Sequence, residues 1–475
     1  MNKDSDNHHH DQDNSNPPVK IGLEIHGYLS LENNRKLFCD CSLDPDAAPN
    51  STICPVCTGQ PGSKPFAPNS EAIEKIIAIG LLFGASINQE MLFQRKHYSW
   101  PDLPAGYQKT MSGSYGKPSA EHGSFFGIRI RELHLEEDPA RWDPDTGTVD
   151  YNRSGYPLME LVSEPDFKSA AEVETWLKTF IAALSYIRAL NPALGIKCDV
   201  NISIGPEFIR TELKNMNALK NIKDAIAYEI YRQQREPAML QTRTYDPITK
   251  KTVFMRPKEE AADYQYIPEP DLLPITILPA TIESIRSRLP ESPETKYHRY
   301  LTQGVDETDA SVIARNLDVA GLFDAVTMSV PAPFAAKWFR RDITAAAESP
   351  ALLLHLVEYR DELEKLFRLV HKKEITDITF KELLEKLSEE FVDVEQYVKD
   401  KQLLRLGHDD EQVQGIIAGA IASSPDAVND FFQGKEKALN LIVGKVMQRT
   451  QGKAQPEHVK ESILKMLHTI KQESG

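Results

Sequence analysis

The sequence lacks any apolar run that approaches the ~18 residues needed to span a bilayer, and only five of its 475 residues are cysteines. The first absence argues against a helical membrane protein, and the second against a disulfide scaffold. The first residues, rich in Asp, Asn and His, have neither the apolar core of a secretory signal nor the Arg-rich pattern of an import signal. An odd number of cysteines is typical of a reducing compartment. We therefore expect a cytoplasmic protein with no membrane partner.

Positive charge is also scarce overall. The formal net charge of -15 argues against a general nucleic-acid coat or a membrane-surface protein, but it leaves room for a local basic patch. The chain has no G-x-x-x-x-G-K-[ST] phosphate loop, no dinucleotide fingerprint and no evident Ser-His-Asp arrangement. A nucleotide would therefore need Mg²⁺ and Lys or Arg side chains to hold its phosphates. Lys96, Tyr98 and Arg153 lie in the best candidate segments, and an exposed ion-pair surface is the alternative.

Secondary-structure patterns divide the chain into a mixed half and a helical half. Short β-like runs at 125–130, 158–162 and 200–204 alternate with helical periodicity at 70–83, 170–190 and 219–234. A Pro-rich segment, 267–279, follows and is expected to be a loop. We predict an α+β fold, in which a mixed-sheet cradle domain with a zinc knuckle is followed by an all-helical domain and a small helical tail domain. The predicted boundaries are a disordered tail at 1–18, the cradle at 19–290, the helical domain at 291–400 and the tail domain at 401–475.

The helical half carries apolar stripes and a basic end. Side chains at 363, 366, 367 and 370 recur at helical spacing, as do those at 439, 442, 443 and 446 and those at 459, 463, 466 and 467, so we expect them in the core. A break at 407–410 divides this half. After Gly434 the charge changes sign, with eight Lys or Arg against four Glu. These last helices are a candidate phosphate-contacting module, and a solvated lysine face is the alternative.

Four of the five cysteines come in two close pairs: Cys39 and Cys41, then Cys54 and Cys57. Tetrahedral zinc needs four soft ligands on turns tight enough to converge, and Pro55 and Gly59 supply such a turn. Because four thiolates leave no position for a labile water, the spacing predicts a structural zinc site. Four unrelated buried thiols are the alternative. The fifth, Cys198, lies alone in a β-like run and is expected to be a small core residue.

A carboxylate and an imidazole lie side by side in the first apolar segment, 21–26. Successive side chains of an extended strand face opposite ways, so Glu24 and His26 share one face while Leu23 and Ile25 share the other. This pair suits a divalent metal site or the polar surface of a catalytic site.

Further acids lie in apolar segments. His134 and Glu136 share a face of their run, Glu137 follows, and Glu160 lies within 156–162, where an uncompensated carboxylate is costly. A hard cation removes that cost, and Mg²⁺ prefers carboxylate and water ligands. Taken singly, each acid is more often a salt-bridge or surface residue, but their repeated placement in apolar strands favours one shared site. The side chains expected to line this cavity are Glu24, His26, Glu136, Glu137 and Glu160.

These strings resemble those of the B subunits of aspartyl/glutamyl-tRNA(Asn/Gln) amidotransferases. The resemblance covers essentially everything after residue 18. The matching segments are 21–26, 54–57, 95–96, 98, 101–104, 106–108, 133–138, 150–153, 161–166, 198–199, 201, 212–215, 255–256, 267–271 and 434–454.

The resemblance implies a two-step reaction. ATP first phosphorylates the side-chain carboxyl of Glu misacylated onto tRNA(Gln), or of Asp on tRNA(Asn), and ammonia released by the glutaminase, or A, partner then displaces phosphate. It implies A and C partner subunits, tRNA, ATP and Mg²⁺, with zinc as structural support, and it makes the helical half a tRNA-binding region. The implied metal and catalytic positions are Glu24, His26, Glu136 or Glu137, and Glu160. The implied cofactor contacts are Lys96, Tyr98, Arg153, Lys214 and Asn215.

The sequence departs from the family pattern in places. The segment 191–197 is shorter than usual and ends in Lys197. Ser99 and Trp100 stand in place of the usual aromatic pair. Ala105 stands where the family usually has Lys. The choice between Glu-tRNA(Gln) and Asp-tRNA(Asn) is therefore left open. Two other classes of protein are the alternatives. A catalytically silent tRNA-binding module is disfavoured by the intact acids, and a zinc-stabilised hydrolase of a small substrate is disfavoured by the basic C-terminal helices.

Overall fold

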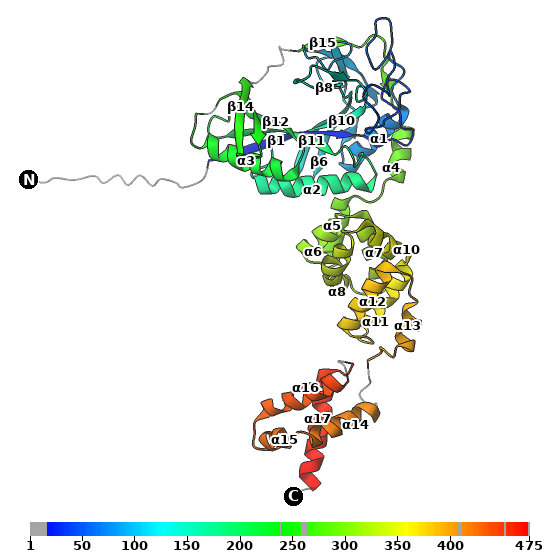
Figure 1. The fold of residues 1–475 in the computed structure, drawn as a ribbon, viewed down its shortest axis with the longest axis vertical. Coiled ribbons are helices and arrows are strands. Elements are labelled where there is room, and N and C mark those ends of the chain that lie inside the picture. Colours follow the sequence, from blue (N-terminus) through cyan, green and yellow to red (C-terminus); the bar gives the residue numbers. More distant parts are fainter. Residues whose placement is uncertain (1–16, 238, 258–263, 406–410, 451–452, 474–475) are drawn as a thin grey trace, which may run out of the picture. The chain divides into compact units, whose positions relative to one another are not determined.

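The computed structural model describes residues 17–237, 239–257, 264–405, 411–450 and 453–473. The chain divides into two compact units, with the division between Glu294 and Thr295 (Figure 1). Among the described residues, every strand belongs to the first unit, and the regular elements of the second unit are helices. The predicted α+β class is thus confirmed. None of the described helices combines the length and apolar character needed to cross a bilayer.

A twelve-stranded mixed sheet forms the first unit. Its main path runs in the order β14 (Lys251–Pro257), β13 (Gln241–Asp246), β12 (Thr211–Met216), β11 (Ile196–Ile204), β1 (Val19–Tyr28), β10 (Pro157–Ser163), β7 (Ile128–Glu137), β5 (Tyr107–Thr110), β4 (Gln94–His97) and β15 (Gln265–Pro268). Off this path, β2 (Ser86–Ile87) pairs with β6 (Ala120–Phe125), which also pairs with β7. Two short ladders join β3 (Glu90–Met91) to β16 (Ile275–Thr276) and β8 (Arg141–Trp142) to β9 (Val149–Asp150).

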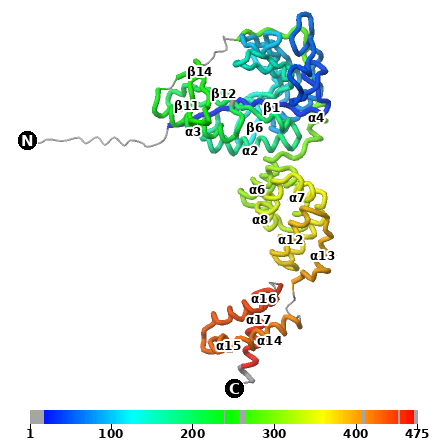
Figure 2. The backbone as a smooth tube through the Cα atoms, viewed as in Figure 1, coloured from blue at the N-terminus to red at the C-terminus, as the bar shows by residue number. Residues whose placement is uncertain are grey.

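The chain order explains the mixed character of the sheet. The pairings of β1 with β10 and β11 are antiparallel, whereas β12 and β13 are parallel. Parallel neighbours need a crossover, and the helix α3 (Leu219–Gln233) supplies it. Figure 2 traces this path from the sheet into the helices of the second unit.

One face of the sheet is the core of the first unit. Ile21, Leu23 and Ile25 of β1 are at most 1% exposed. They belong to one apolar cluster with side chains of α1 (Ser70–Leu82), α2 (Ala170–Tyr186) and α3. The side chains of Asn69 and Ser169 cap α1 and α2 by accepting hydrogen bonds from backbone N–H groups of the first turn. With this face buried against helices, the opposite face is left for polar side chains.

Two expectations about local structure were wrong. The run 125–130 is not one strand, because Phe126 and Gly127 both have positive φ and form the turn between β6 and β7. The expected loop at 267–279 contains the end of β15, all of β16 and the start of α4 (Pro279–Arg288). Predicted helices at 70–83 and 219–234 are present, whereas the third ends at Tyr186, just before Arg188 with its positive φ.

The second unit contains two apolar clusters. One is formed within α5 (Pro293–Thr302), α6 (Glu307–Ile313), α7 (Leu317–Thr327), α8 (Ala332–Trp338), the π-helical turn Phe339–Ile343, α9 (Thr344–Ala346), α10 (Pro350–Glu358), α11 (Arg360–His371), α12 (Asp377–Glu389) and α13 (Val394–Asp400). The other is formed within α14 (Glu411–Ala422), α15 (Pro425–Phe432), the 3-10 turn Glu436–Ala438, α16 (Leu439–Arg449) and α17 (Pro456–Glu473).

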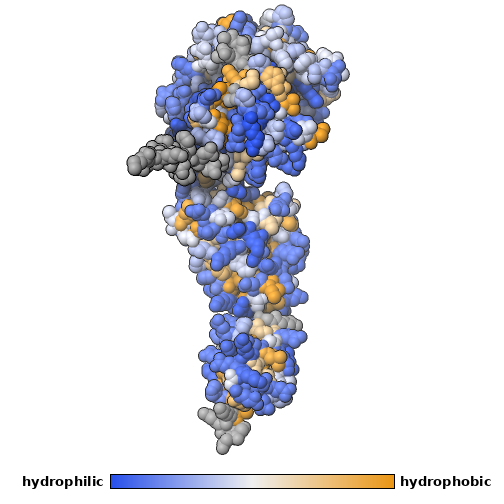
Figure 3. Space-filling model, turned by 90° about the vertical axis from the view of Figure 1, so that its left-hand side faces the viewer, coloured by the Kyte–Doolittle hydropathy of each residue, from blue (hydrophilic) through white to orange (hydrophobic). Residues whose placement is uncertain are grey.

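The predicted helical stripes supply both of these clusters. Leu363, Leu366, Phe367 and Val370 are buried in the first. In the second, the stripes of α16 and α17 are buried except at Val443 and Met466, which pack partly exposed against it. On the face shown in Figure 3, apolar residues are interspersed with hydrophilic ones. The break predicted at 407–410 lies outside the described residues, and the domain boundaries at 18, 290 and 400 stay predictions.

Candidate active site

Three neighbouring strands place an imidazole, a carboxylate and a second imidazole in one row. His26 of β1 pairs directly with Glu160 of β10, which pairs on its other side with His134 of β7. Side chains at paired positions of adjacent strands project to the same face. Because Leu133 and Ile25 project to the core, this row lies on the opposite, polar face of the sheet.

The row is in ionic contact throughout. His26 Nε2 lies 3.2 Å from Glu160 Oε2 and 3.8 Å from Glu136 Oε1. His134 Nε2 lies 3.3 Å from the same oxygen of Glu160, and its Nδ1 lies 3.4 Å from Glu132 Oε1. Both nitrogens of the buried His134 are within ion-pair distance of a carboxylate but outside hydrogen-bond geometry. Glu160 is thus the shared anion between two imidazoles.

Neighbouring charges set the protonation of this row. Burial by itself lowers the pKa of His26, but the carboxylate of Glu160 outweighs it and raises that pKa to about 9. The same balance raises the pKa of His134 to about 10. Burial acts to raise the pKa of Glu160, yet the two imidazoles hold it well below its ordinary value. Burial, reinforced by Glu160, raises the pKa of Glu136.

A second group of acids adjoins the row on β1, β11 and β12. One oxygen from each of Glu24, Asp199 and Glu212 lies within 4.8 Å of the others. The ammonium of Lys214 is 2.7 Å from Asp199 Oδ2 and 3.7 Å from Glu212 Oε1. The amide of Asn201 donates a hydrogen bond of 3.0 Å to Glu24 Oε1. Burial, followed by the charge of Glu160, raises the pKa of Glu24, so the two groups interact electrostatically.

Four of the five predicted catalytic residues therefore lie on one face, and Glu137 does not. His26, Glu136 and Glu160 form one group of potential ligands, while Glu24 belongs to the second group. Glu137 follows Glu136 in β7 and points the other way, where its Oε1 is 2.8 Å from Lys109 Nζ. Strand alternation separates these two neighbouring carboxylates.

Two of the predicted cofactor contacts, Lys96 and Tyr98, lie near Glu136. The ammonium of Lys96 is 4.7 Å from the centre of the Tyr264 ring, and its charge acts on Glu136. Tyr98 packs edge-on against Tyr264, and burial raises the pKa of its hydroxyl. Lys214 belongs to the second acid group, and the side chain of Asn215 lies outside the described residues.

Arg153 reaches the site through a buried acid. Its Nε is 2.6 Å from Asp138 Oδ2, and its Nη2 donates to the carbonyl of Ala140 at 3.4 Å. Asp138 Oδ2 also accepts a hydrogen bond of 2.9 Å from the hydroxyl of Tyr28, on β1. Arg153 is therefore fixed beside the strand that carries Glu24 and His26.

Both acid groups offer ligands that fit Mg²⁺. Octahedral Mg²⁺ places neighbouring ligand atoms about 3 Å apart and opposite ones about 4 Å apart. The contacts of His26 with Glu160 and Glu136, at 3.2 and 3.8 Å, fall in this range. Two carboxylates and an imidazole leave room for water ligands, whereas the second group is purely carboxylate and already holds the Lys214 ammonium.

The four clustered cysteines fit zinc. None of them forms a disulfide, and their sulfurs all lie within 4.8 Å of one another. The sulfurs of Cys54 and Cys57 are 3.8 Å apart, which is about the edge of a tetrahedron with Zn–S bonds of about 2.3 Å. Gly59 has a φ of +64°, and an added Cβ would come within 2.5 Å of the Pro104 backbone, so the turn requires glycine there. The spacing-based prediction of a convergent four-cysteine cluster is confirmed.

Several residues of the polar face were not selected from the sequence. His134 was recognised as a neighbour of Glu136 but not as a site residue, and Asp199 and Glu212 were noted only in matching strings. A signal was present, because in β11 Lys197, Asp199 and Asn201 alternate with buried apolar residues. We name the polar face by its members: Glu24, His26, Glu132, His134, Glu136, Glu160, Asp199, Glu212 and Lys214.

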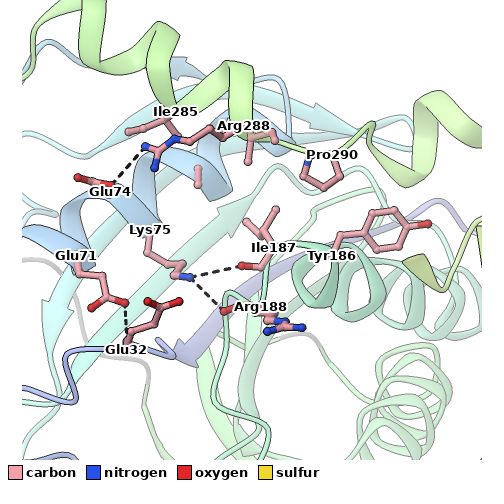
Figure 4. Close-up of a pocket in the computed structure, with 12 residues that line it drawn as sticks. Glu32, Glu71, Glu74, Lys75, Tyr186, Ile187, Arg188, Ile285, Arg288 and Pro290 are labelled. Carbon is pink, nitrogen blue, oxygen red and sulfur yellow. Dashed lines mark hydrogen bonds and ion pairs between the residues drawn. The ribbon is translucent and has the colours of Figure 1, made fainter. Parts of the chain in front are cut away.

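A pocket of about 450 Å³ occurs elsewhere in the first unit, lined by residues of α1, α4 and the end of α2 (Figure 4). Lys75 donates to the carbonyls of Ile187 and Arg188, and Glu74 lies 3.6 Å from Arg288. No residue of the polar face lines this pocket. Since Glu71, Glu74, Lys75 and Arg288 are each paired with one another or with backbone, we do not select this pocket as the active site.

Comparisons with known proteins identify the family of the chain. The pattern of the GatB/GatE catalytic domain matches residues 19–283, which include the whole polar face, and that of the GatB domain matches residues 321–467. The B subunit of an aspartyl/glutamyl-tRNA(Asn/Gln) amidotransferase from Methanothermobacter thermautotrophicus is 38% identical over 460 residues, covering 94% of this chain and 99% of the relative. A protein of the same name from Methanobrevibacter smithii is 39% identical over 454 residues, covering 92% and 97%. The chain belongs to the family of aspartyl/glutamyl-tRNA(Asn/Gln) amidotransferase B subunits.

Proposed function

We propose that this chain is the B subunit of a tRNA-dependent amidotransferase that converts Glu-tRNA(Gln) to Gln-tRNA(Gln), or Asp-tRNA(Asn) to Asn-tRNA(Asn). It would phosphorylate the side-chain carboxyl with ATP and then exchange phosphate for ammonia. The observation that carries the proposal is the polar face, whose two acid groups lie within the segment that matches the catalytic domain. A binding module without catalysis has no need to bury this set of acids.

The first step makes the carboxyl reactive. A carboxylate is a poor electrophile because its leaving group would be oxide. Its oxygen attacks the γ-phosphorus of ATP, a new O–P bond forms, and the bond to ADP breaks. When bound, Mg²⁺ reduces the repulsion between the carboxylate and the triphosphate. We assign Glu136, Glu160 and His26, the last in its deprotonated form, to hold Mg²⁺, with Lys96 near Glu136 as a cation for phosphate.

The second step replaces phosphate by nitrogen. Ammonia attacks the carboxyl carbon, the C–N bond forms, and the C–O bond to phosphate breaks. The nitrogen gives up a proton, and we assign a carboxylate of the polar face to accept it. Lys214 and Arg153, held by Asp199 and Asp138, would position the phosphate and the aminoacyl end.

Other parts of the chain and two partner subunits take supporting roles in this proposal. The four-cysteine cluster holds structural zinc. The glutaminase (A) partner supplies ammonia, and the C partner completes a heterotrimer. The basic end of the chain contacts tRNA phosphates, and its exposed cations support this role. These are Lys435, Lys437, Arg449, Lys460 and Lys465.

The test is ATP hydrolysis by the complex with the A and C partners, with and without misacylated tRNA. Wild type is compared with Glu136→Gln and with Glu207→Gln, an exposed residue outside the polar face. We expect hydrolysis stimulated by the misacylated tRNA in wild type and in Glu207→Gln, and loss of that stimulation in Glu136→Gln.

Each outcome separates the alternatives. Stimulation by Glu-tRNA(Gln) or by Asp-tRNA(Asn) identifies the natural substrate. Normal tRNA binding without stimulation by either would contradict the catalytic role and favour the binding module.

A further inference from the structure

Lys36 is a buried lysine beside the four-cysteine cluster. It is only 1% exposed, a degree of burial that lysine almost never reaches without partners. Its backbone N–H donates to the carbonyl of Cys41 at 3.0 Å, so Lys36 closes the loop that presents Cys39 and Cys41. The side chain is therefore built into the cluster and is not a surface residue folded over it.

The ammonium of Lys36 has three acceptors. It donates to the carbonyl of Thr52 at 3.0 Å, to the carbonyl of Tyr151 at 3.3 Å and to the sulfur of Cys57 at 3.4 Å. An ammonium has three N–H donors, so these contacts use all of them. One cation thus joins a sulfur of the cluster to two backbone segments that lie about 100 residues apart in sequence.

These two segments are also joined directly. Ser154 Oγ donates to the carbonyl of Cys57 at 2.7 Å, and Thr52 N–H donates to the side chain of Asn152 at 3.0 Å. The amide of Asn152 donates to the carbonyl of Ala48 at 2.7 Å. The loop that carries Cys54 and Cys57 therefore forms the support against which the segment 150–156 lies.

The same segment delivers Arg153 to the active site. Arg153 is 2.6 Å from Asp138, and the backbone on its C-terminal side is paired with Asp138 in both directions. Gly155 N–H donates to the Asp138 carbonyl, and Asp138 N–H donates to the Tyr156 carbonyl, each at 2.9 Å. A displacement of 150–156 would move the guanidinium relative to Asp138.

The geometry points to Lys36 as a positioning residue that couples the four-cysteine zinc cluster to Arg153. Four thiolates exceed the charge of Zn²⁺ by two, and the ammonium on Cys57 offsets part of this excess. Removing the ammonium leaves two part-buried carbonyls without this donor and takes one of its donors from the Cys57 sulfur, which also accepts from the backbone N–H of Cys54. Both the metal site and the support of 150–156 are weakened as a result. The effect on catalysis rests on the proposed function, whereas the coupling of zinc to this segment does not.

The test compares Lys36→Met, which keeps the length of the side chain without its donors, with Lys168→Met, at an exposed lysine. The full-length chain is titrated with a zinc chelator, and its backbone hydrogen exchange is followed by mass spectrometry. We expect Lys36→Met to bind zinc about tenfold more weakly than wild type, the size of effect typical when a residue hydrogen-bonded to a metal ligand is replaced. We also expect its backbone amides at 150–156 to exchange hydrogen faster. Lys168→Met should match wild type in both readouts.

A second arm uses wild type alone, in case Lys36→Met does not fold. Zinc is stripped by the chelator, and exchange at 150–156 is compared with that of the hairpin of β6 and β7. Faster exchange confined to 150–156 supports the coupling. Unchanged protection of 150–156 after zinc removal, or wild-type zinc affinity in Lys36→Met, would overturn it. Neither readout uses ATP or tRNA, so failure of the proposed function would appear separately, as absent hydrolysis with the coupling intact.

Discussion

His26 and Glu160 are direct cross-strand neighbours, with His26 Nε2 3.2 Å from Glu160 Oε2. The same carboxylate contacts His134 from the other side. Strand pairing therefore fixes the Glu160 carboxylate between the two imidazoles, and the row depends on this residue.

Glu160→Gln should raise the Mg²⁺ concentration needed for tRNA-stimulated ATP hydrolysis by about 10- to 100-fold. The amide keeps the shape of the carboxylate but loses the charge that attracts both imidazoles and the metal. The measurement is a Mg²⁺ titration of hydrolysis by the complex. Glu164→Gln, just beyond the end of β10 and paired with the exposed Arg131, serves as the control. An unchanged Mg²⁺ requirement in Glu160→Gln would remove this residue from the metal site.

Glu136→Gln and Glu137→Gln should behave differently although the residues are adjacent. Glu137 pairs with the buried Lys109, so its substitution leaves a buried charge without its partner and should lower the free energy of unfolding by about 3 kcal/mol. The Mg²⁺ requirement of Glu137→Gln should stay that of wild type, because the side chain of residue 137 points away from the polar face. Urea unfolding and the same Mg²⁺ titration check both parts. Loss of tRNA-stimulated hydrolysis in Glu137→Gln, as expected for Glu136→Gln, would contradict the orientation of β7.

Zinc should depend on the clustered cysteines and not on the fifth. Cys41→Ser removes one of the four convergent sulfurs, so the purified chain should lose its bound zinc, measured by elemental analysis. Cys198→Ser is the matched control, because Cys198 lies in the core cluster of the sheet. Retention of zinc by Cys41→Ser, or its loss in Cys198→Ser alone, would place the metal elsewhere.

Asp324 should stabilise the helical unit in a pH-dependent way. It lies 2.5 Å from Lys296 Nζ and 3.0 Å from an Arg299 nitrogen. Burial acts to raise its pKa, but Arg299 and Lys296 hold it below its ordinary value. A depressed pKa in the folded state stabilises the protein above the ordinary Asp pKa, and this contribution is lost as the pH falls through the folded value.

Asp324→Asn should therefore cost about 2 kcal/mol of unfolding free energy at neutral pH, and the difference from wild type should shrink as the pH falls below the ordinary Asp pKa. Urea unfolding followed by circular dichroism over a pH series measures it. Asp361→Asn, at an exposed position, should show a much smaller difference. A deficit for Asp324→Asn that persists unchanged at low pH would contradict the ionic account.

Local patterns in the sequence were enough to place some of the site. Alternation alone put Glu24 and His26 on one face of a strand, and the spacing of the cysteines predicted their convergence. The row of His26, Glu160 and His134 could not be predicted, because it depends on which strands pair and in what register, and β1 lies more than 100 residues from both β7 and β10 in sequence. The turn at Phe126 and Gly127 was missed because Phe126, an aromatic residue with positive φ, carries no turn signal, and the single Gly127 was not given enough weight within an apolar run.

The most direct test of the central claim is to trap the activated carboxyl. The complex with the A and C partners is given misacylated tRNA and ATP labelled at the γ-phosphate, with neither glutamine nor ammonia present. The account predicts that label appears on the aminoacyl-tRNA and that hydroxylamine converts the labelled species to a side-chain hydroxamate. At a Mg²⁺ concentration just sufficient for wild type, Glu160→Gln should form neither product. Release of all label as free phosphate by wild type, with no hydroxamate on either Glu-tRNA(Gln) or Asp-tRNA(Asn), would contradict it.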